Sequence, residues 1–183
     1  MATIYVNNAP FIQKNFVVSG AFGEPRTGHV HTGLDLAPVG YRGSLYAIDE
    51  FTVIYSAYDA SGYGNYFIAR SPNNILYLYA HMLGLPPALG THYNLYDYVG
   101  ECGNSGPPGT GWHVHLAMQQ GTTWTFSNNL SDYIDPTTYL TGINNVVDYS
   151  QYYYFDGTPG PTPTPGVKKS RFPWYIYQNT PGL

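Results

Sequence analysis

Four side chains in two short runs of the sequence have the chemistry of a metal site. His31 and Asp35 lie in the run HTGLDLAP, and His113 and His115 lie in the run HVHLAM. Imidazole nitrogens and carboxylate oxygens are the ligands that a hydrolytic zinc ion takes without any thiolate. A catalytic zinc keeps three protein ligands and leaves a fourth position open for water. His81, in the run YLYAHM between the two, is a candidate chemical partner of these residues.

The elements that carry these residues must bring them to one place. The HVHLAM run favours a β-strand, in which His113 and His115 share a face because side chains alternate along a strand. His31 and Asp35 are four residues apart, a helical spacing, but Gly33 and the following proline and glycine argue against a helix. We expect a turn that leads into a strand, from which both side chains can reach one ion. Taken alone, His113 and His115 also fit two half-buried strand histidines. Taken alone, His31 and Asp35 also fit an ordinary polar turn.

Strand signals dominate the whole chain. Short runs rich in β-branched and aromatic residues alternate with Gly, Pro, Asn and Asp, which are typical of turns. No stretch with a helical period is longer than about ten residues. The sequence therefore predicts a mainly β domain built on an antiparallel sheet. The expected strands are IYVNN, NFVVSG, SLYAI, FTVIYSAY, NYFIAR, NILYLYAH and WHVHLAM, with a further strand around Tyr98 and Val99 and a last short element, DYIDPTTYL, at 132–140.

Three other residues with reactive side chains are expected to lie outside the site. His29 forms a second His-Val-His with His31, but a surface or supporting role fits it better. His92 is expected in a loop without a function. Cys102 is the only cysteine, so an intrachain disulfide and a thiolate zinc site are both excluded. A small buried residue or a free thiol describes Cys102 better than a nucleophile does.

Composition restricts the class of protein. The 183 residues are enough for one well-buried domain, and 17% of them are aromatic while 10% are charged. Lys and Arg total 7 and the net charge is -4, so no nucleic-acid partner is expected. No apolar run reaches the ~20 residues of a membrane-spanning helix, so no membrane partner is expected either. The amino terminus lacks the pattern of a signal peptide.

The sequence predicts one folded domain followed by a linker and a tail. The domain is expected over residues 1–156, and the run GTPGPTPTPG at 157–166 is a Pro/Thr/Gly-rich linker of extended character. The tail at 167–183 is too short to build a core of its own. It is a strand docked on the domain, an exposed interaction peptide, or the remnant of a lost region.

The motif runs, taken together, resemble the lysostaphin-type zinc metallopeptidases, which are peptidoglycan-cleaving endopeptidases of bacteria and phages. The resemblance extends over roughly residues 18 to 140 and keeps the order of the family's segments. The segments that carry it are VSGAFGEPR, HTGLDLAPVGYRGSLYAIDEFTVIYSA, GYGNYFIAR, YLYAHM and VGECGNSGPPGTGWHVHLAM.

The resemblance implies a role for each candidate residue. His31, Asp35 and His115 become the ligands of a Zn2+ ion, and His81 and His113 become the catalytic pair beside it. It also implies that long loops of the β domain frame a zinc-binding groove. Which member of the pair acts as the general base is not determined.

Two departures from the family pattern concern the surroundings of the site. The family often has Phe-Glu where this chain has Ala117 and Met118, so the support of the ligands is expected to differ. The loop at 83–97 has an unusual composition, which is expected to affect the choice of substrate.

The resemblance implies a zinc-dependent endopeptidase that hydrolyses amide bonds in peptidoglycan cross-bridge or stem peptides. Its partner would be the peptidoglycan of bacterial cell walls, and it would act outside the cell, as a secreted mature form or as a phage- or prophage-encoded protein. A monomer is expected, although the sequence does not determine the oligomeric state. The tail would then be the remnant of a wall-binding region. The alternatives are a catalytically silent or phage-tail-associated wall-binding member of the same family; a sugar-binding module fits the metal residues less well.

Overall fold

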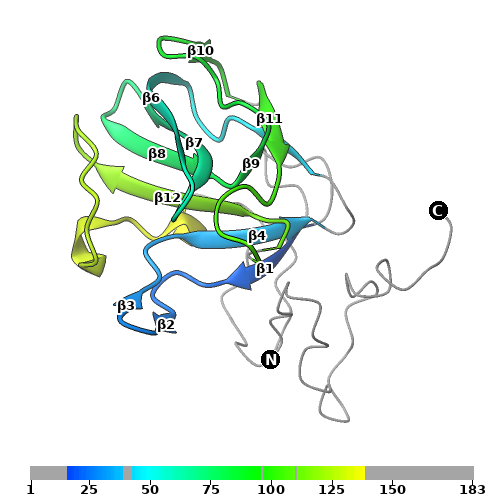
Figure 1. Ribbon diagram of the computed structural model, residues 1–183. Coiled ribbons are helices and arrows are strands. Elements are labelled where there is room, and N and C mark those ends of the chain that lie inside the picture. Colours follow the sequence, from blue (N-terminus) through cyan, green and yellow to red (C-terminus); the bar gives the residue numbers. More distant parts are fainter. Residues whose placement is uncertain (1–15, 39–42, 96, 110, 139–183) are drawn as a thin grey trace, which may run out of the picture.

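The computed structural model describes residues 16–38, 43–95, 97–109 and 111–138, and within these ranges the fold is mainly β, as the sequence predicts (Figure 1). A large antiparallel sheet forms the centre of the molecule. In spatial order its seven strands are β1 (Phe16–Gly20), β4 (Leu34–Pro38), β12 (Val114–Gln120), β8 (Ile75–Ala80), β7 (Gly64–Arg70), β6 (Phe51–Asp59) and β10 (His92–Tyr93).

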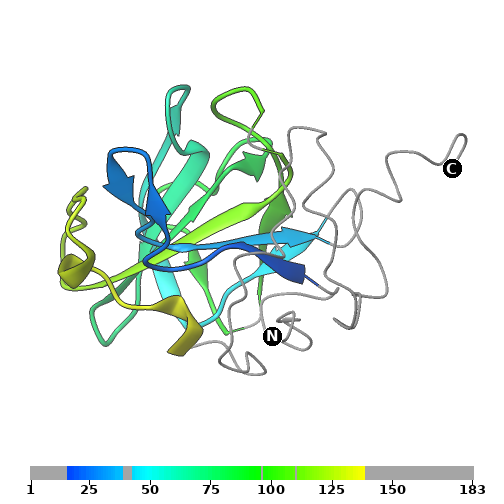
Figure 2. The same cartoon turned by 90° about the horizontal axis from the view of Figure 1, so that it is seen from below.

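Smaller elements complete the described structure. The segment after β12 runs along one side of the main sheet, and the hairpin near the start of the described chain projects beside it (Figures 1 and 2). These elements are a three-stranded sheet of β5 (Ser44–Tyr46), β11 (Tyr98–Cys102) and β9 (Met82–Leu83), a hairpin of β2 (Pro25–Arg26) and β3 (His29–Val30), and the 3-10 helices η1 (Leu130–Asp132) and η2 (Pro136–Thr138).

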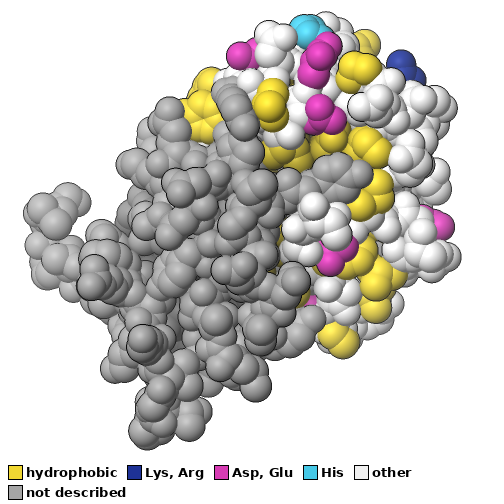
Figure 3. All heavy atoms as spheres, turned by 180° about the vertical axis from the view of Figure 1, so that it is seen from behind, with side chains coloured by type: hydrophobic (Ala, Val, Ile, Leu, Met, Phe, Trp, Pro, Cys, Tyr) yellow, Lys and Arg dark blue, Asp and Glu magenta, His cyan; other side chains and the backbone are white. Residues whose placement is uncertain are grey.

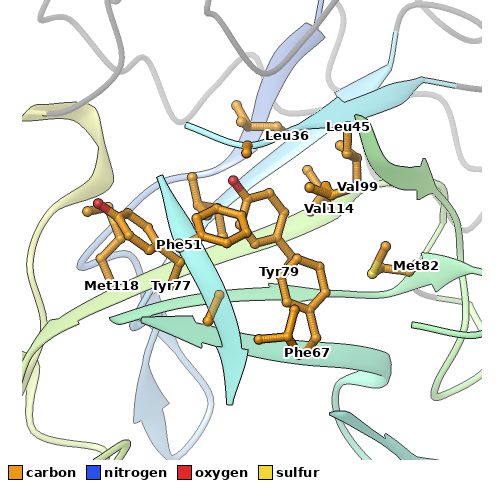
Figure 4. Close-up of a cluster of buried hydrophobic side chains, with 14 of the residues drawn as sticks. Leu36, Leu45, Phe51, Phe67, Tyr77, Tyr79, Met82, Val99, Val114 and Met118 are labelled. Carbon is orange, nitrogen blue, oxygen red and sulfur yellow. The ribbon is translucent and has the colours of Figure 1, made fainter. Parts of the chain in front are cut away.

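The main hydrophobic core lies between the large sheet and the three-stranded sheet. Alternating apolar residues on the central strands point into it because side chains alternate between the faces of a sheet. Leu45, Val99 and Met82, from the three-stranded sheet, belong to the same buried cluster. Phe67 and Tyr79 stack within it with ring centroids 4.9 Å apart (Figure 4). This core fixes one face of the large sheet and makes it rigid.

The opposite face of the large sheet carries the residues of interest. Leu34 and Leu36 point into the main core, so Asp35 between them points to the other face. Val114 and Leu116 do the same on β12, which places His115 beside Asp35. The register pairs His115 directly with Asp35 on β4 and with Ala80 on β8. The two strands therefore present both side chains side by side at one position.

The predicted strands agree well with the structure, with small corrections. His92 is not in a loop: it pairs with Thr52 as part of β10. His113 does not lie within a strand, because β12 begins at Val114 and His113 forms an isolated bridge with Gly103. The expected strand IYVNN, the linker at 157–166 and the tail at 167–183 lie outside the described residues.

The described surface carries few cationic side chains, and the described helices are 3-10 helices of three residues each. On the face seen from behind, dark blue for Lys and Arg occupies only a small area of the described residues (Figure 3). Among the residues that the structure describes, no helix is long and apolar enough to cross a membrane.

Candidate metal centre

Three donor atoms meet on this second face of the large sheet, which also carries a smaller buried hydrophobic cluster. His31 Nε2 lies 3.0 Å from Asp35 Oδ1 and 3.0 Å from His115 Nδ1, and His115 Nδ1 lies 2.8 Å from the same carboxylate oxygen. All three residues are buried. Two imidazole nitrogens and a carboxylate oxygen at these distances form a set that can hold a metal ion.

The protonation pattern of the histidines fits a cation. His31 Nδ1 lies 2.6 Å from the carbonyl oxygen of Ala21, to which it must donate, so the neutral imidazole has its lone pair on Nε2. That lone pair points at His115 Nδ1 and at the carboxylate. Since lone pairs facing each other at 3.0 Å repel, a proton or a cation must lie among the three donors. The residues therefore fit a divalent metal of the kind that imidazole and carboxylate bind.

Arg26 holds the outer oxygen of Asp35. Its Nη2 donates to Asp35 Oδ2 at 2.7 Å and also lies 3.5 Å from the carboxylate of Glu24. Asp35 Oδ1 thereby remains the oxygen that faces the two histidines. Burial alone would raise the pKa of the Asp35 carboxyl, but the charges of His31 and His113 and the hydrogen bonds of the site hold it well below its usual range. Asp35 is therefore a carboxylate at neutral pH.

His115 is oriented by packing. A metal-binding histidine usually donates its second nitrogen to a protein acceptor, but His115 Nε2 is buried and has no hydrogen-bond partner among the described residues. Its ring lies instead between Gly33, which has no side chain, and Tyr63, whose ring centroid is 5.6 Å away. Among the described residues, His115 Nε2 thus lacks the supporting hydrogen bond that a metal-binding histidine usually has. The difference in support expected from Ala117 and Met118 stays a prediction.

His81 stands next to the three donors in a strained backbone conformation. Its φ of 59° lies in the left-handed region, which costs a non-glycine residue about 1 kcal/mol or more. The conformation is held by two hydrogen bonds: the His81 N–H donates to the Tyr63 carbonyl at 2.8 Å, and Nδ1 donates to the Ser105 carbonyl at 2.8 Å. The second bond leaves the lone pair of the neutral imidazole on Nε2. Burial and the nearby His113 lower the pKa of His81 to about 4, so the ring is neutral at pH 7.

His113 faces the same space from the other side. Its N–H donates to the Gly103 carbonyl at 2.9 Å, and its Nδ1 lies 3.2 Å from the Gly111 carbonyl. Its Nε2 lies 3.9 Å from Asp35 Oδ1, and the ring centroids of His113 and His81 are 4.4 Å apart. The structure therefore brings all five predicted site residues together, although they come from separate segments of the chain.

Ser105 links the loop before β12 to the end of β8. Its carbonyl accepts from His81, its hydroxyl donates to the Met82 carbonyl at 2.9 Å, and the same hydroxyl accepts from the Asn65 N–H at 2.8 Å. Gly64, with φ of 60°, allows this close approach, because a Cβ there would collide with the Ser105 carbonyl group and hydroxyl. The orientation of His81 thus depends on a glycine in another strand.

The other reactive residues lie outside the site. His29 is exposed, and its Nδ1 lies 3.1 Å from the carbonyl of its neighbour Thr27, in keeping with a surface role. His92 is exposed on β10 beside Thr52. Cys102 is a free cysteine in the main core, and burial raises the pKa of its thiol well above the usual value. A thiolate nucleophile is therefore disfavoured at this position.

Sequence reasoning did not identify three residues that support the site. Arg26, Tyr63 and Ser105 reach the site through contacts with residues 9 to 52 positions away, which strand periodicity does not reveal. Glycines signal two of them in the sequence: Gly20 leaves room for the Arg26–Asp35 pair, and Gly64 leaves room for Ser105.

Comparisons with known proteins agree with this geometry. The model of "Peptidase family M23" matches residues 29–128, a range that includes all five site residues. A comparison with curated protein sequences finds no significant match. Among solved structures, the catalytic domain of a point mutant of the prophage-encoded M23 protein EnpA from Enterococcus faecalis is 26% identical with a TM-score of 0.54, over 68% of this chain and 91% of that one.

A second solved structure supports the fold alone. The catalytic domain of the antimicrobial peptidase lysostaphin from Staphylococcus simulans is 22% identical with a TM-score of 0.53, over 67% of this chain and 88% of that one. The family match covers more than half of the 183 residues and includes the whole metal centre. The chain belongs to peptidase family M23.

Proposed function

We propose that this protein is a zinc-dependent endopeptidase that hydrolyses amide bonds in the peptide part of bacterial peptidoglycan. The observation that carries the proposal is the meeting of His31, Asp35 and His115 at 2.8–3.0 Å, with His81 and His113 beside them. Membership in peptidase family M23 and the likeness to the EnpA catalytic domain support it.

The three donors would hold the zinc ion with a net charge of about +1, since two neutral imidazoles and one carboxylate surround a divalent cation. When bound, zinc supplies a Lewis acid that polarises the scissile carbonyl and lowers the pKa of a water toward ~7. Arg26 holds the outer oxygen of Asp35, so a single carboxylate oxygen would face the ion. The site would therefore keep a position open for water and substrate.

His81 and His113 would move the protons. Both rings direct Nδ1 at a backbone carbonyl, so Nε2 of each is the atom that meets the substrate. The Nε2 lone pair of one ring accepts a proton from the attacking water. That ring, now protonated at Nε2, can donate a hydrogen bond to the developing oxyanion. The pair then returns a proton to the leaving amine. No nucleophilic side chain takes part in this scheme, so no acyl-enzyme forms.

The proposed partner is the peptide of the cell wall, either a cross-bridge or a stem peptide. The protein would therefore act on the outside of bacterial cells. A silent family member that only binds the wall is the competing function, and the presence of all five residues in one place argues against it, because each has a chemical task in hydrolysis.

Lysis of purified cell walls tests the proposal. Metal-replete protein is added to walls of several Gram-positive species, and turbidity, new amino termini and new reducing sugars are followed. The proposal predicts a loss of turbidity with new amino termini and no reducing sugars, abolished by a chelator and by His115→Ala. Binding to walls with no new amino termini in any species would favour the silent wall-binding alternative.

A further inference from the structure

A set of aromatic rings leads away from the metal centre along the same face of the large sheet, and part of it belongs to or packs against the smaller buried cluster. We call it the aromatic strip, and it consists of Tyr63, Tyr66, Tyr55, Phe126 and Trp124. It begins at the metal centre, because Tyr63 contacts His115 with ring centroids 5.6 Å apart. Its further centroid distances are 5.7 Å from Tyr63 to Phe126, 5.5 Å from Tyr63 to Tyr66, 5.9 Å from Tyr66 to Tyr55 and 6.3 Å from Phe126 to Trp124.

The side chains of two members of the strip are about half exposed to solvent. Phe126 is 55% exposed and Tyr55 is 49% exposed, although large apolar side chains are more stable when buried. Both exposed rings contact the buried ring of Tyr66, with centroid distances of 6.4 Å for Phe126 and 5.9 Å for Tyr55, so they lie near each other. Exposed apolar side chains gathered in this way commonly mark a binding site. The continuity with the metal centre places that binding site beside the proposed reaction.

The loop that presents Phe126 and Trp124 is fixed from both sides. The buried amide of Gln119 donates to the Thr125 carbonyl at 2.7 Å and accepts from the Thr125 N–H at 3.0 Å. The Tyr133 hydroxyl donates to the Ser127 carbonyl at 2.9 Å and accepts from the Ser127 N–H at 3.1 Å. These two pairs of hydrogen bonds hold the backbone of the loop in place. A ligand that binds there therefore loses little binding free energy to ordering the loop.

The aromatic strip has no charged side chain, which favours an uncharged ligand. The strip contains only Tyr, Phe and Trp side chains, and Asp59, the last residue of β6, accepts from the Ser61 N–H and hydroxyl. Within the described ranges the cationic side chains are Arg26 and Arg70. Arg26 is paired with Asp35, and Arg70 Nη1 donates to the Thr122 carbonyl at 3.3 Å. Among the described residues, neither arginine is a member of the strip, so the strip itself offers no charged partner to the carboxylates of a stem peptide.

We infer that the aromatic strip binds a sugar ring of the glycan strand while the attached peptide enters the metal centre. This inference rests on the proposed function, since it names a second part of the same substrate. The apolar C–H face of an N-acetylated pyranose packs on flat aromatic rings, and Tyr hydroxyls provide partners for its polar groups. A glycine cross-bridge is also uncharged, but it has no side chain to cover Phe126 and Tyr55.

Direct binding of an uncharged oligosaccharide tests the inference without turnover. The probe is tetra-N-acetylchitotetraose, titrated into the full chain by calorimetry. We expect saturable binding with a dissociation constant of about 1 mM or tighter. Phe126→Ala and Tyr55→Ala should each weaken binding by about 5- to 100-fold, the usual worth of one stacked ring. Circular dichroism of each variant shows whether the fold is retained, and Phe126→Tyr should keep most of the affinity.

Tyr98→Ala is the matched control, because Tyr98 is 53% exposed but lies on β11 in the other sheet. It should bind the oligosaccharide as the parent does. No saturable binding, or binding that Phe126→Ala and Tyr55→Ala both leave unchanged, would overturn the inference. So would Phe126-dependent binding of pentaglycine without binding of the sugar, which would make the strip a peptide subsite. Sugar binding by a chain that hydrolyses no wall peptide would refute the proposed function only.

Discussion

Gly33 lies against the imidazole of His115, so closely that a Cβ at position 33 would be 2.6 Å from both Cε1 and Nε2 of that ring. The same Cβ would be 2.6 Å from the carbonyl oxygen of Leu116, which belongs to β12 and cannot move far. His115 has no hydrogen bond at Nε2 to hold its ring among the described residues, so this contact sets its orientation. The glycine of the HTGLD run is thus part of the metal centre.

Gly33→Ala should therefore weaken metal binding. The added methyl group displaces the His115 ring, and we expect metal affinity to fall by about 10- to 100-fold and the fold to lose about 1–3 kcal/mol from overpacking. Competition with a chromophoric chelator measures the affinity. Gly84→Ala is the control, because a Cβ there meets nothing within 4 Å although its φ of 81° is strained. Equal metal affinities of the parent and Gly33→Ala would contradict this account of His115.

Arg26→Met should lower metal affinity through Asp35. Without the donor at 2.7 Å, the outer carboxylate oxygen is left buried and unpaired, and the carboxylate is free to rotate. Loss of such a supporting residue typically costs about 10- to 100-fold in metal affinity. Arg70→Met removes another cation that lies away from the site and should have no effect. If both variants bound zinc like the parent, Arg26 would have no role in the centre.

Gly64→Ala should impair hydrolysis while leaving the metal in place. A Cβ at this position collides with Ser105, whose carbonyl accepts the hydrogen bond from His81 Nδ1, so the His81 ring loses its orientation. We expect kcat to fall by about 10- to 100-fold, as small misplacements of catalytic groups do. Metal content by atomic spectroscopy should stay at the parent's value.

Gly90→Ala separates this effect from backbone strain. Its φ of 82° is as unfavourable for alanine as that of Gly64, but nothing lies within 4 Å of the new Cβ. The variant should lose some stability and keep its kcat. A loss of kcat in Gly90→Ala as large as in Gly64→Ala would show that general strain, and not the position of His81, is responsible.

The metal-free protein should lose stability in mild acid. The folded state lowers the pKa of His81 and of His115 to about 4, in each case chiefly through burial, below the ordinary 6.5. The unfolded chain thus binds more protons than the folded one between about pH 6.5 and 4. Stability should be complete above pH 6.5 and fall as the pH drops, by up to about 1.4 kcal/mol per pH unit for each group.

Urea unfolding at a series of pH values measures this effect. Because a metal binds only the deprotonated imidazoles, zinc-loaded protein should keep its stability to a lower pH than metal-free protein. A free energy of unfolding that stayed constant from pH 7 to 5 in the metal-free protein would contradict the burial of these rings in neutral form.

Much of the fold and of the site could be predicted because both depend on local patterns. Alternation along FTVIYSAY reflects burial of one face of β6, whereas the continuous apolar run ILYLYA reflects burial of both faces of β8. The structure contains FTVIYSAY, NYFIAR and NILYLYAH as β6, β7 and β8. The His31–Asp35 spacing reflects one turn into one strand. Such patterns are visible in the sequence because each is determined by neighbours along the chain.

The remaining features depend on contacts between distant segments. The strand at His92 exists only because it pairs with Thr52, forty residues earlier. His113 leaves the strand geometry because its backbone bridges to Gly103. The support of His81 by Ser105 and of Asp35 by Arg26 likewise follows from the folded topology. No periodicity in the sequence contains this information.

The most direct test of the account compares zinc content and amide hydrolysis in the same samples of the parent, His115→Ala and His81→Gln. A soluble peptidoglycan peptide is the substrate, and new amino groups are counted. We expect one zinc per chain in the parent and in His81→Gln, little in His115→Ala, and rapid hydrolysis by the parent alone. Hydrolysis at the parent's rate by His115→Ala without zinc, or by His81→Gln, would contradict it.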